Sequence, residues 1–261
     1  MSRKIAMAVS AAALLVFLFS LLYPVFLLLS KSLYNGKTFE PYGYIRFLLL
    51  GDRFYMGLVN SFLYASIISL GQLVPTVLMS FVLAKFDFKP KKALYLLYIM
   101  VFLVPFQVLM LPSHHILDFL GLMGTKGAVC LSQIYLPFGV VFFTQYIKGI
   151  PDGIVESAQI DGASASKILT KVILPMSKNI LAAIFAIMFV DNWNIMEPVI
   201  MFAGESSNYP ATVVVREAIE QNSDYIFIAG ALCMLLPLTI YLAVKNFIRG
   251  NIPWENHEPK E

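Results

Sequence analysis

A short polar segment inside a largely apolar run contains the residues of this sequence best suited to chemistry. The run 179–204 includes Asp191, Asn192, Trp193, Asn194 and Glu197. Amides and carboxylates hydrogen-bond polar ligands, and an indole ring stacks on flat surfaces. Ionisable groups at membrane depth are costly and usually face a protein interior or a water-filled path. The segment is therefore a candidate lining of a polar pathway. The alternative is a position near the outer surface, where Asp191 and Glu197 contact water.

Other polar residues in apolar runs have less specific interpretations. Gln107 is a second candidate for the pathway, although a glutamine there can equally form an interhelical hydrogen bond. The adjacent residues His114 and His115 do not face one another on a helix, so we expect an interfacial pair rather than a metal site. The two cysteines, Cys130 and Cys233, have no CxxC or zinc spacing. We predict no catalytic residue and no metal site.

The composition restricts the kind of protein that holds these residues. Of the 261 residues, 59% are hydrophobic and 13% are charged, and the mean hydropathy is +0.75. Soluble domains are about 45–50% apolar and about 25% charged. The composition therefore excludes a disordered protein and argues against a soluble globular enzyme. The apolar runs are continuous, which favours membrane helices over a transmembrane β-barrel. The net charge of +3 gives no reason to expect a nucleic-acid partner.

Six apolar runs are long enough to cross a bilayer, which takes about 20 residues per helix. They cover residues 5–29, 60–84, 93–113, 127–147, 179–204 and 225–244. The first run is too long for the apolar part of a signal peptide, so we expect it to be retained. The sequence therefore predicts an all-α integral membrane protein with six transmembrane helices and a single domain over residues 1–261.

Lysine and arginine predict the orientation, because they are enriched in cytoplasmic segments. If both termini are cytoplasmic, the inner segments contain thirteen of the 19 basic residues. We therefore expect both termini in the cytoplasm. The tightest basic tract, Lys85–Lys92, is expected to anchor this topology, with binding of lipid head groups as the alternative.

The inner loop 148–178 has a helical pattern of its own. Pro151 suits the first position of a helix, and Gly162 suits a stop with positive φ. A second helix is expected over about 164–174, and Pro175 is expected to end it. The loop is thus predicted to form a helix–turn–helix on the cytoplasmic face. It is either a surface connector or a docking platform for a cytoplasmic partner.

This loop resembles the EAA loop of ABC-importer permeases. The resemblance rests on Glu156, Ser157, Ala158, Asp161, Gly162, Ala163 and Pro175. The family pattern is E-A-A, a glycine after three residues, nine residues, a branched apolar residue, one free position and Leu-Pro. Ser157 stands where the family has its second-position alanine. The Asp-Gly-Ala continuation is typical of the carbohydrate-uptake, maltose-type branch, and weaker similarity extends over about residues 60–249.

The resemblance implies the type I importer permease fold and a division of labour between subunits. The first helix of the loop would be a coupling helix that binds a separate cytoplasmic ATPase. Glu156 would pair with an arginine of that ATPase, the small residues of the motif would permit close approach, and Gly162 would form the turn. ATP and Mg would belong to the partner. This sequence contains no G-x-x-x-x-G-K-[ST] motif, so we expect no enzyme activity and no cofactor in this chain.

The resemblance also implies partners and a cargo. Such a permease works with a second, homologous permease, two ATP-binding subunits and an extracytoplasmic solute-binding protein, within the lipid of the bacterial cytoplasmic membrane. The cargo would be a carbohydrate, with an oligosaccharide as the expected class and a monosaccharide or a polyol phosphate as the alternatives. The family carries a Trp-Asn pair near the pathway, which Trp193 and Asn194 match, so Trp193 would stack on a sugar ring. Ile195, Met196 and Glu197 depart from the family's usual continuation.

Two other classes of membrane protein are alternatives. Secondary transporters often show internal repeats and paired broken spans. Here only the run 179–204 looks interrupted, and no repeat is visible. An intramembrane enzyme would need a nucleophile–base pair or a metal set within the spans. An ATPase that co-purifies with the chain would separate the importer from both alternatives, because neither of them needs one.

Overall fold

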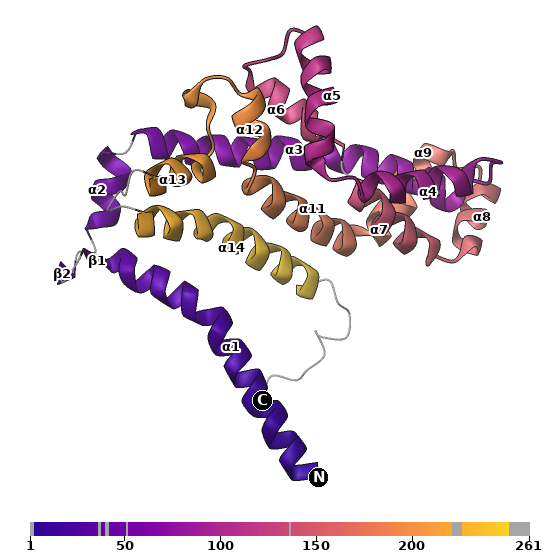
Figure 1. Cartoon of the computed structure of the whole chain (residues 1–261). Coiled ribbons are helices and arrows are strands. Elements are labelled where there is room, and N and C mark those ends of the chain that lie inside the picture. The colour runs from indigo at the N-terminus through magenta and orange to yellow at the C-terminus, as the bar shows by residue number, and fades with distance from the viewer. Residues whose placement is uncertain are drawn as a thin grey trace.

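The computed structural model describes residues 3–35, 38–39, 42–50, 52–135, 137–220 and 226–250. These residues are almost entirely helical, with one small antiparallel sheet in which Tyr34 pairs with Phe39 (Figure 1). The elements are α1 (Arg3–Leu33), β1 (Tyr34–Asn35), β2 (Thr38–Phe39), α2 (Gly43–Leu50), α3 (Asp52–Lys85), α4 (Lys91–Phe102), α5 (Phe106–Phe119), α6 (Lys126–Gln133), α7 (Pro137–Lys148), α8 (Asp152–Ile160), α9 (Ala165–Ile168), η1 (Leu169–Ile173), α10 (Leu174–Met176), α11 (Lys178–Trp193), α12 (Glu197–Phe202), η2 (Ser206–Asn208), α13 (Ala211–Glu220) and α14 (Ile226–Gly250).

Four helical segments are long and apolar enough to cross a membrane. They are Val9–Leu33, Arg53–Lys85, Lys126–Lys148 and Ile226–Gly250. Two more pass the same criteria only as bent pairs: α4 with α5, bent by 100°, and α9–α10 with α11, bent by 80°. The described part of the chain thus holds four candidate spans, or up to six if each bent pair is one span. The first, second, fourth and sixth predicted runs fall on these four segments. The fourth run covers α6 and α7, between which residue 136 lies outside the described residues, as does Tyr225 at the start of the sixth run.

The third predicted run, 93–113, is not one straight helix. α4 ends at Phe102, and α5 begins at Phe106 in a different direction. Pro105 between them has no N–H to continue the hydrogen-bond ladder, and its ring disfavours a helical conformation at Val104. The expectation that only the run 179–204 is interrupted was therefore wrong, because the run 93–113 is broken as well.

The fifth predicted run, 179–204, is broken at its polar segment. α11 ends at Trp193, and α12 begins at Glu197 with Pro198 in its first turn. Proline cannot donate the backbone hydrogen bond that a continuing helix needs, so it favours a new helix start at this point. The break leaves residues 194–196 outside any helix, next to the polar side chains.

The prediction that Pro175 ends the second loop helix was also wrong. The chain forms a π turn over Leu169–Ile173 and continues through α10 to Met176. A π turn is wider than an α turn, and a proline lacks the N–H that the narrower ladder would use. The helix therefore continues beyond Pro175, and Ser177 forms the 80° bend into α11.

The central helix is α3. It runs along most of the length of the bundle and packs against α6, α7, α11 and α13 (Figure 1). Near its C-terminal end, Phe81 joins an apolar cluster with Phe143 of α7. Nearer its N-terminal end, Tyr64 joins a second cluster with Val129 and Phe202. α1 diverges from the bundle and packs mainly on α14, which leaves the side chains of residues 9–24 exposed. Helix α3 therefore connects the two ends of the molecule.

The loop that follows α5 and the loop that follows α12 are held together by hydrogen bonds. The amide of Gly124 donates to the carbonyl of Phe202, and Asn208 donates to the carbonyls of Gly124 and Ala203. Gly204 has a φ of 69°, and a Cβ there would lie 2.8 Å from the Cα of Gly124. Only glycine allows both this conformation and this approach of two backbones.

We predict that Gly204→Ala destabilises the protein more than Gly121→Ala, as measured by thermal unfolding in detergent. Both glycines have positive φ, which costs an alanine about 1–2 kcal/mol. Nothing lies within 4 Å of a Cβ at Gly121, whereas the overpacking at Gly204 costs about 1–3 kcal/mol more. Equal losses for the two variants would show that the backbone contact with Gly124 contributes nothing.

Candidate functional site

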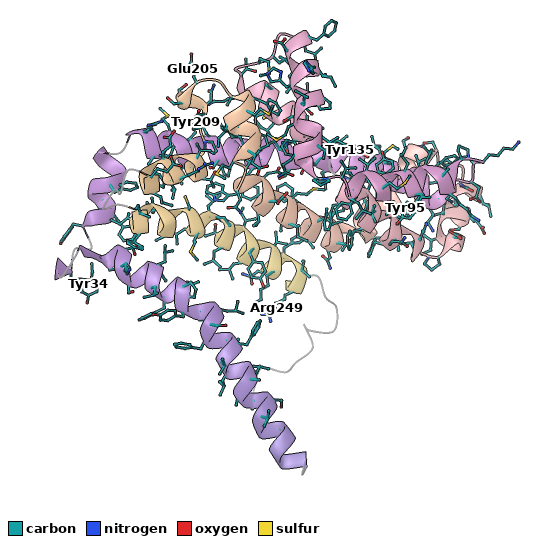
Figure 2. The ribbon with its side chains drawn as sticks, viewed as in Figure 1. Tyr34, Tyr95, Tyr135, Glu205, Tyr209 and Arg249 are labelled. Carbon is teal, nitrogen blue, oxygen red and sulfur yellow. The ribbon has the colours of Figure 1, made fainter. Side chains whose placement is uncertain are left out.

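Two groups of sequence-predicted residues lie at different places along the bundle. The polar segment lies at the break between α11 and α12, and the EAA-like loop forms α8 to α10 beyond the end of α7. Figure 2 shows Glu205 and Tyr209 on the side where α5 and α12 project, and Tyr95 on α4 toward the α8 end. The molecule thus has a polar site and a surface loop that are separated along α3.

The break between α11 and α12 opens into a cavity of about 310 Å³. Its lining consists of Phe106, Gln133, Asp191, Asn192, Asn194, Ile195, Met196, Glu197 and Pro198. Four of the residues predicted for the pathway therefore share one cavity with groups from α5 and α6. The cavity joins two carboxylates and several amides to an apolar wall, an arrangement that can hydrogen-bond a ligand rich in hydroxyl groups.

A hydrogen bond that the sequence alone could not decide places Gln107 beside this cavity. Its Nε2 donates to Oε2 of Glu197 at 2.8 Å and so joins α5 to α12. Gln107 is not itself a lining residue. Both interpretations of this glutamine therefore apply in part, because it forms an interhelical hydrogen bond and that bond orients a carboxylate of the cavity.

Asn192 is the buried anchor of the polar segment. Its Nδ2 lies within hydrogen-bond distance of Ser69 Oγ (3.0 Å), Gln72 Oε1 (2.9 Å) and the carbonyl of Met188 (2.8 Å). Gln72 in turn donates to the carbonyl of Gln133 at 2.7 Å. The network ties α3, α6 and α11 together next to the cavity. Sequence reasoning missed Ser69, because a small hydroxyl in an apolar run gives no signal of its partner.

Trp193 does not line the cavity, which corrects the expectation that it stacks on a sugar ring. Its side chain is 1% exposed and packs against Phe189 and Ala65. Its Nε1 donates to the carbonyl of Cys233 on α14 at 3.1 Å. Successive residues of a helix point about 100° apart, and this rotation directs Trp193 toward α14, whereas Asp191 and Asn192 line the cavity. The indole holds α11 against α14.

The EAA-like loop begins with α8, which ends in a glycine turn. Gly162 has a φ of 78°, its amide donates to the carbonyl of Gln159, and Ala163 donates to the carbonyl of Ala158. This pair of bonds is a Schellman motif, and glycine is favoured at the left-handed position. The turn directs the chain from α8 into α9. The predicted stop at Gly162 is thereby confirmed.

One face of α8 packs on the bundle and the other is open. Val155 is buried in the cluster around Phe143, with Ala158 and Ala163 at its edge. The exposed residues of the motif are Glu156, Ser157, Asp161, Gly162 and Pro175. Ile160 at the end of α8 is 86% exposed, and among the described large apolar side chains only Phe119 is more exposed. Sequence reasoning did not single out this isoleucine.

We predict that Asn192→Leu lowers the stability of the protein by about 1–2 kcal/mol, a typical value for an interhelical hydrogen bond in a membrane protein. The variant keeps the side-chain volume but leaves Gln72 Oε1 without its donor. The control is Asn194→Leu, since the amide of Asn194 is exposed and donates only to Val190 in its own helix. Thermal unfolding in detergent measures both, and an equal effect would contradict the network.

Comparisons with known proteins agree with these observations. Residues 48–250 match the family model described as binding-protein-dependent transport system inner membrane component. Among similar proteins is the arabinooligosaccharides transport system permease protein AraQ of Halalkalibacterium halodurans, 29% identical over 69% of this chain and 66% of that protein, just under two thirds of its length. Another is the sn-glycerol-3-phosphate transport system permease protein UgpE of Yersinia pestis, 26% identical over 76% of this chain and 73% of that protein.

A solved structure has the same fold. It is a crystal structure of a bacterial ABC transporter involved in the import of the acidic polysaccharide alginate, with a TM-score of 0.81 and 21% identity over 95% of this chain and 98% of that chain. The family match covers most of the described residues, including both the cavity and the EAA-like loop. The chain therefore belongs to the family of binding-protein-dependent transport system inner membrane components.

Proposed function

We propose that this chain is a permease subunit of a binding-protein-dependent ABC importer that carries a carbohydrate, with oligosaccharides as the favoured class, into the cytoplasm. The main observation that supports the proposal is the exposed face of α8 with its glycine turn, in a chain of this family. The names of two relatives support the cargo class, because they refer to arabinooligosaccharides and alginate, whereas a third refers to the polyol phosphate sn-glycerol-3-phosphate. The polar cavity is chemically suited to such hydroxyl-rich ligands.

The proposed topology has six spans in a single domain of the type I permease fold, with each bent helix pair counted as one span. The distribution of basic residues places both termini in the cytoplasm and α8 on the cytoplasmic face. This topology puts the cavity at the α11–α12 break closer to the outer side. Asp191, Asn194 and Glu197 would then line the translocation pathway, with Asn192 as their support.

In this proposal the energy comes from ATP and Mg bound to two partner ATP-binding subunits. The first loop helix, α8, is the coupling helix and presents Glu156 and Ile160 to one of them. A carboxylate paired with an arginine makes a charge-assisted hydrogen bond, about twice as strong as a neutral one. A second permease would complete the pathway, and an extracytoplasmic solute-binding protein would deliver the sugar. Closure of the ATPase pair would switch the two permeases between inward and outward access.

The two bent helix pairs are a specific observation that a secondary transporter would also explain. Recovery of the chain from its native membrane without any ATP-binding subunit, even after crosslinking, would favour that alternative. Recovery with an ATP-binding subunit would favour the importer, because ion-coupled transport needs no ATPase.

We predict that Glu156→Lys weakens association with the ATP-binding subunit about tenfold or more, because it replaces an attractive charge by a repulsive one. The measurement is the amount of ATPase recovered when the tagged permease is purified in mild detergent. Glu205→Lys is the matched control, since it makes the same charge reversal at an exposed position in the loop after α12. Equal recovery for Glu156→Lys and the parent would contradict the proposed docking face.

We predict that Asp191→Asn impairs uptake while the amount of assembled complex stays normal. A hydrogen bond to a charged group contributes about 1.5–3 kcal/mol, so half-saturation should shift by about 10- to 100-fold. Uptake is measured with labelled arabinooligosaccharides, sn-glycerol-3-phosphate and alginate oligosaccharides. Asp118→Asn serves as the control, because Asp118 is exposed on α5 and outside the cavity. Unchanged uptake in Asp191→Asn would remove Asp191 from the pathway.

A further inference from the structure

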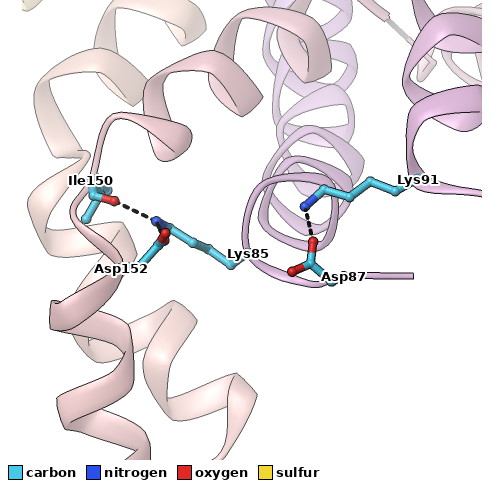
Figure 3. Close-up of polar contacts among 5 residues, drawn as sticks. All are labelled: Lys85, Asp87, Lys91, Ile150 and Asp152. Carbon is cyan, nitrogen blue, oxygen red and sulfur yellow. Dashed lines mark hydrogen bonds and ion pairs between the residues drawn. The ribbon is translucent and has the colours of Figure 1, made fainter. Parts of the chain in front are cut away.

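Lys85, the last residue of α3, has a buried side chain although the sequence suggests only a topology anchor. Its side chain is 3% exposed. Lysine is almost never fully buried unless it is paired. Its Nζ donates to the carbonyl of Ile150 and to Oδ1 of Asp152, both at 2.6 Å (Figure 3). The ammonium group therefore joins α3 to the segment that leads into α8.

Both helix ends favour this contact. A positive charge is stabilised at the C-terminus of α3, and a negative charge is stabilised at the N-terminus of α8, where Asp152 is the first residue. The hydrogen bond from Lys85, and then its charge, lower the pKa of the Asp152 carboxyl below its ordinary value. Because the pKa of Asp152 is lowered, its carboxylate is ionised and paired with Lys85 at every pH above the ordinary pKa of aspartate. The stabilisation from the contact is lost only as the pH falls through the lowered pKa of Asp152. The Asp152 carboxyl therefore stays ionised to a lower pH than an ordinary aspartate does.

The other contacts between α8 and the bundle are apolar. Val155 and its neighbours pack into the cluster that contains Phe81 of α3 and Phe143 of α7. Apolar contacts have no preferred direction, so they permit a helix to slide or roll. The two bonds of Lys85 are directional and charge-assisted. They fix the start of α8 to one point on α3.

The same helix also holds the polar cavity. Ser69 and Gln72 of α3 hydrogen-bond Asn192 at the cavity wall. Helix α3 runs as one element from Asp52 to Lys85, with Pro75 removing one hydrogen bond of its ladder between Gln72 and Lys85. A displacement of α8 that pulls on Lys85 therefore reaches Asn192 through one helix, without crossing a loop.

We infer that Lys85 is a positioning residue that makes α8 and α3 move as one body, and that it transmits the motion of the ATPase to the cavity. This inference rests on the proposed function, because it requires α8 to be the coupling helix. The apolar contacts of α8 place the helix, whereas the Lys85 contact couples its movement to the pathway. Loss of Lys85 should therefore uncouple the cavity from ATP while the ATPase remains bound.

Lys91 provides a matched control in the same tract. Its Nζ donates to Oδ1 of Asp87 at 3.0 Å, within four residues of the same segment, and Asp87 is 99% exposed (Figure 3). This pair does not join α8 to α3, and the charge of Lys91 is only the smallest of the influences that lower the pKa of Asp152. Lys91→Met removes the same charge from the same membrane face as Lys85→Met, so any general effect of charge on topology is common to both variants.

The test uses the complex as it is purified with its ATP-binding subunits and reconstituted in vesicles. The parent carries Cys130→Ala and Cys233→Ala, plus Asn194→Cys as a reporter in the cavity. The rate of labelling by a membrane-impermeant maleimide is measured with and without Mg-ATP and vanadate. In the parent and in Lys91→Met, we expect the rate to change when the nucleotide is trapped. In Lys85→Met, we expect ATPase recovery and ATP hydrolysis to persist while the nucleotide-dependent change falls about tenfold, within the range of coupling between distant sites.

The conservative variant Lys85→Arg should restore most of the response, because a guanidinium can still donate to both acceptors. A purely structural role would instead lower complex recovery in Lys85→Met, and that result would overturn the inference. A response in Lys85→Met equal to that of the parent would also overturn it, while leaving the importer proposal intact. A parent that recovers no ATPase would refute the proposed function itself and the inference with it.

Discussion

The interaction on which this structure depends most is the pairing of buried polar groups along α3. In apolar surroundings such groups must find partners within the protein. On α3 the paired groups are Asn60, Ser61, Ser69, Gln72, Ser80 and Lys85, whereas the buried hydroxyl of Thr76 has no partner among the described residues. The paired groups bond segments outside α3, from the loop before α13 and its first residue at one end to the start of α8 at the other. The packing around α3 is apolar, but these bonds determine which segment lies opposite each turn.

Helix α3 differs from the broken helix pairs of the bundle. α4 and α5 separate at Pro105, and α11 and α12 separate before Pro198, so neither pair is a straight rod. A continuous helix can carry a displacement along its axis, whereas a broken one can open a polar cavity at the break. The molecule combines both, because residues 194–196, which lie outside any helix, follow closely after the side-chain amide of Asn192 that α3 holds.

The fold brings together only some of the polar residues that the sequence predicts for the pathway. Asp191, Asn194 and Glu197 share a cavity, because their helix breaks between them. Trp193 is adjacent in sequence yet belongs to the core, because the helix turns it toward α14. Gln107 and Glu197 meet although they are far apart in sequence. Lys85 and Asp152 are likewise distant, and each looked ordinary in its own segment.

The sequence by itself determined the helical membrane class, the approximate apolar runs, the glycine turn at Gly162 and the family resemblance of the loop. These features depend on local composition and spacing, which hydropathy, proline and glycine express directly. Only the tertiary structure decided where α4 and α5 diverge, which side of α11 faces the cavity and what Lys85 binds. Those outcomes depend on contacts between distant segments, and a buried polar residue does not reveal its partner until the helices pack.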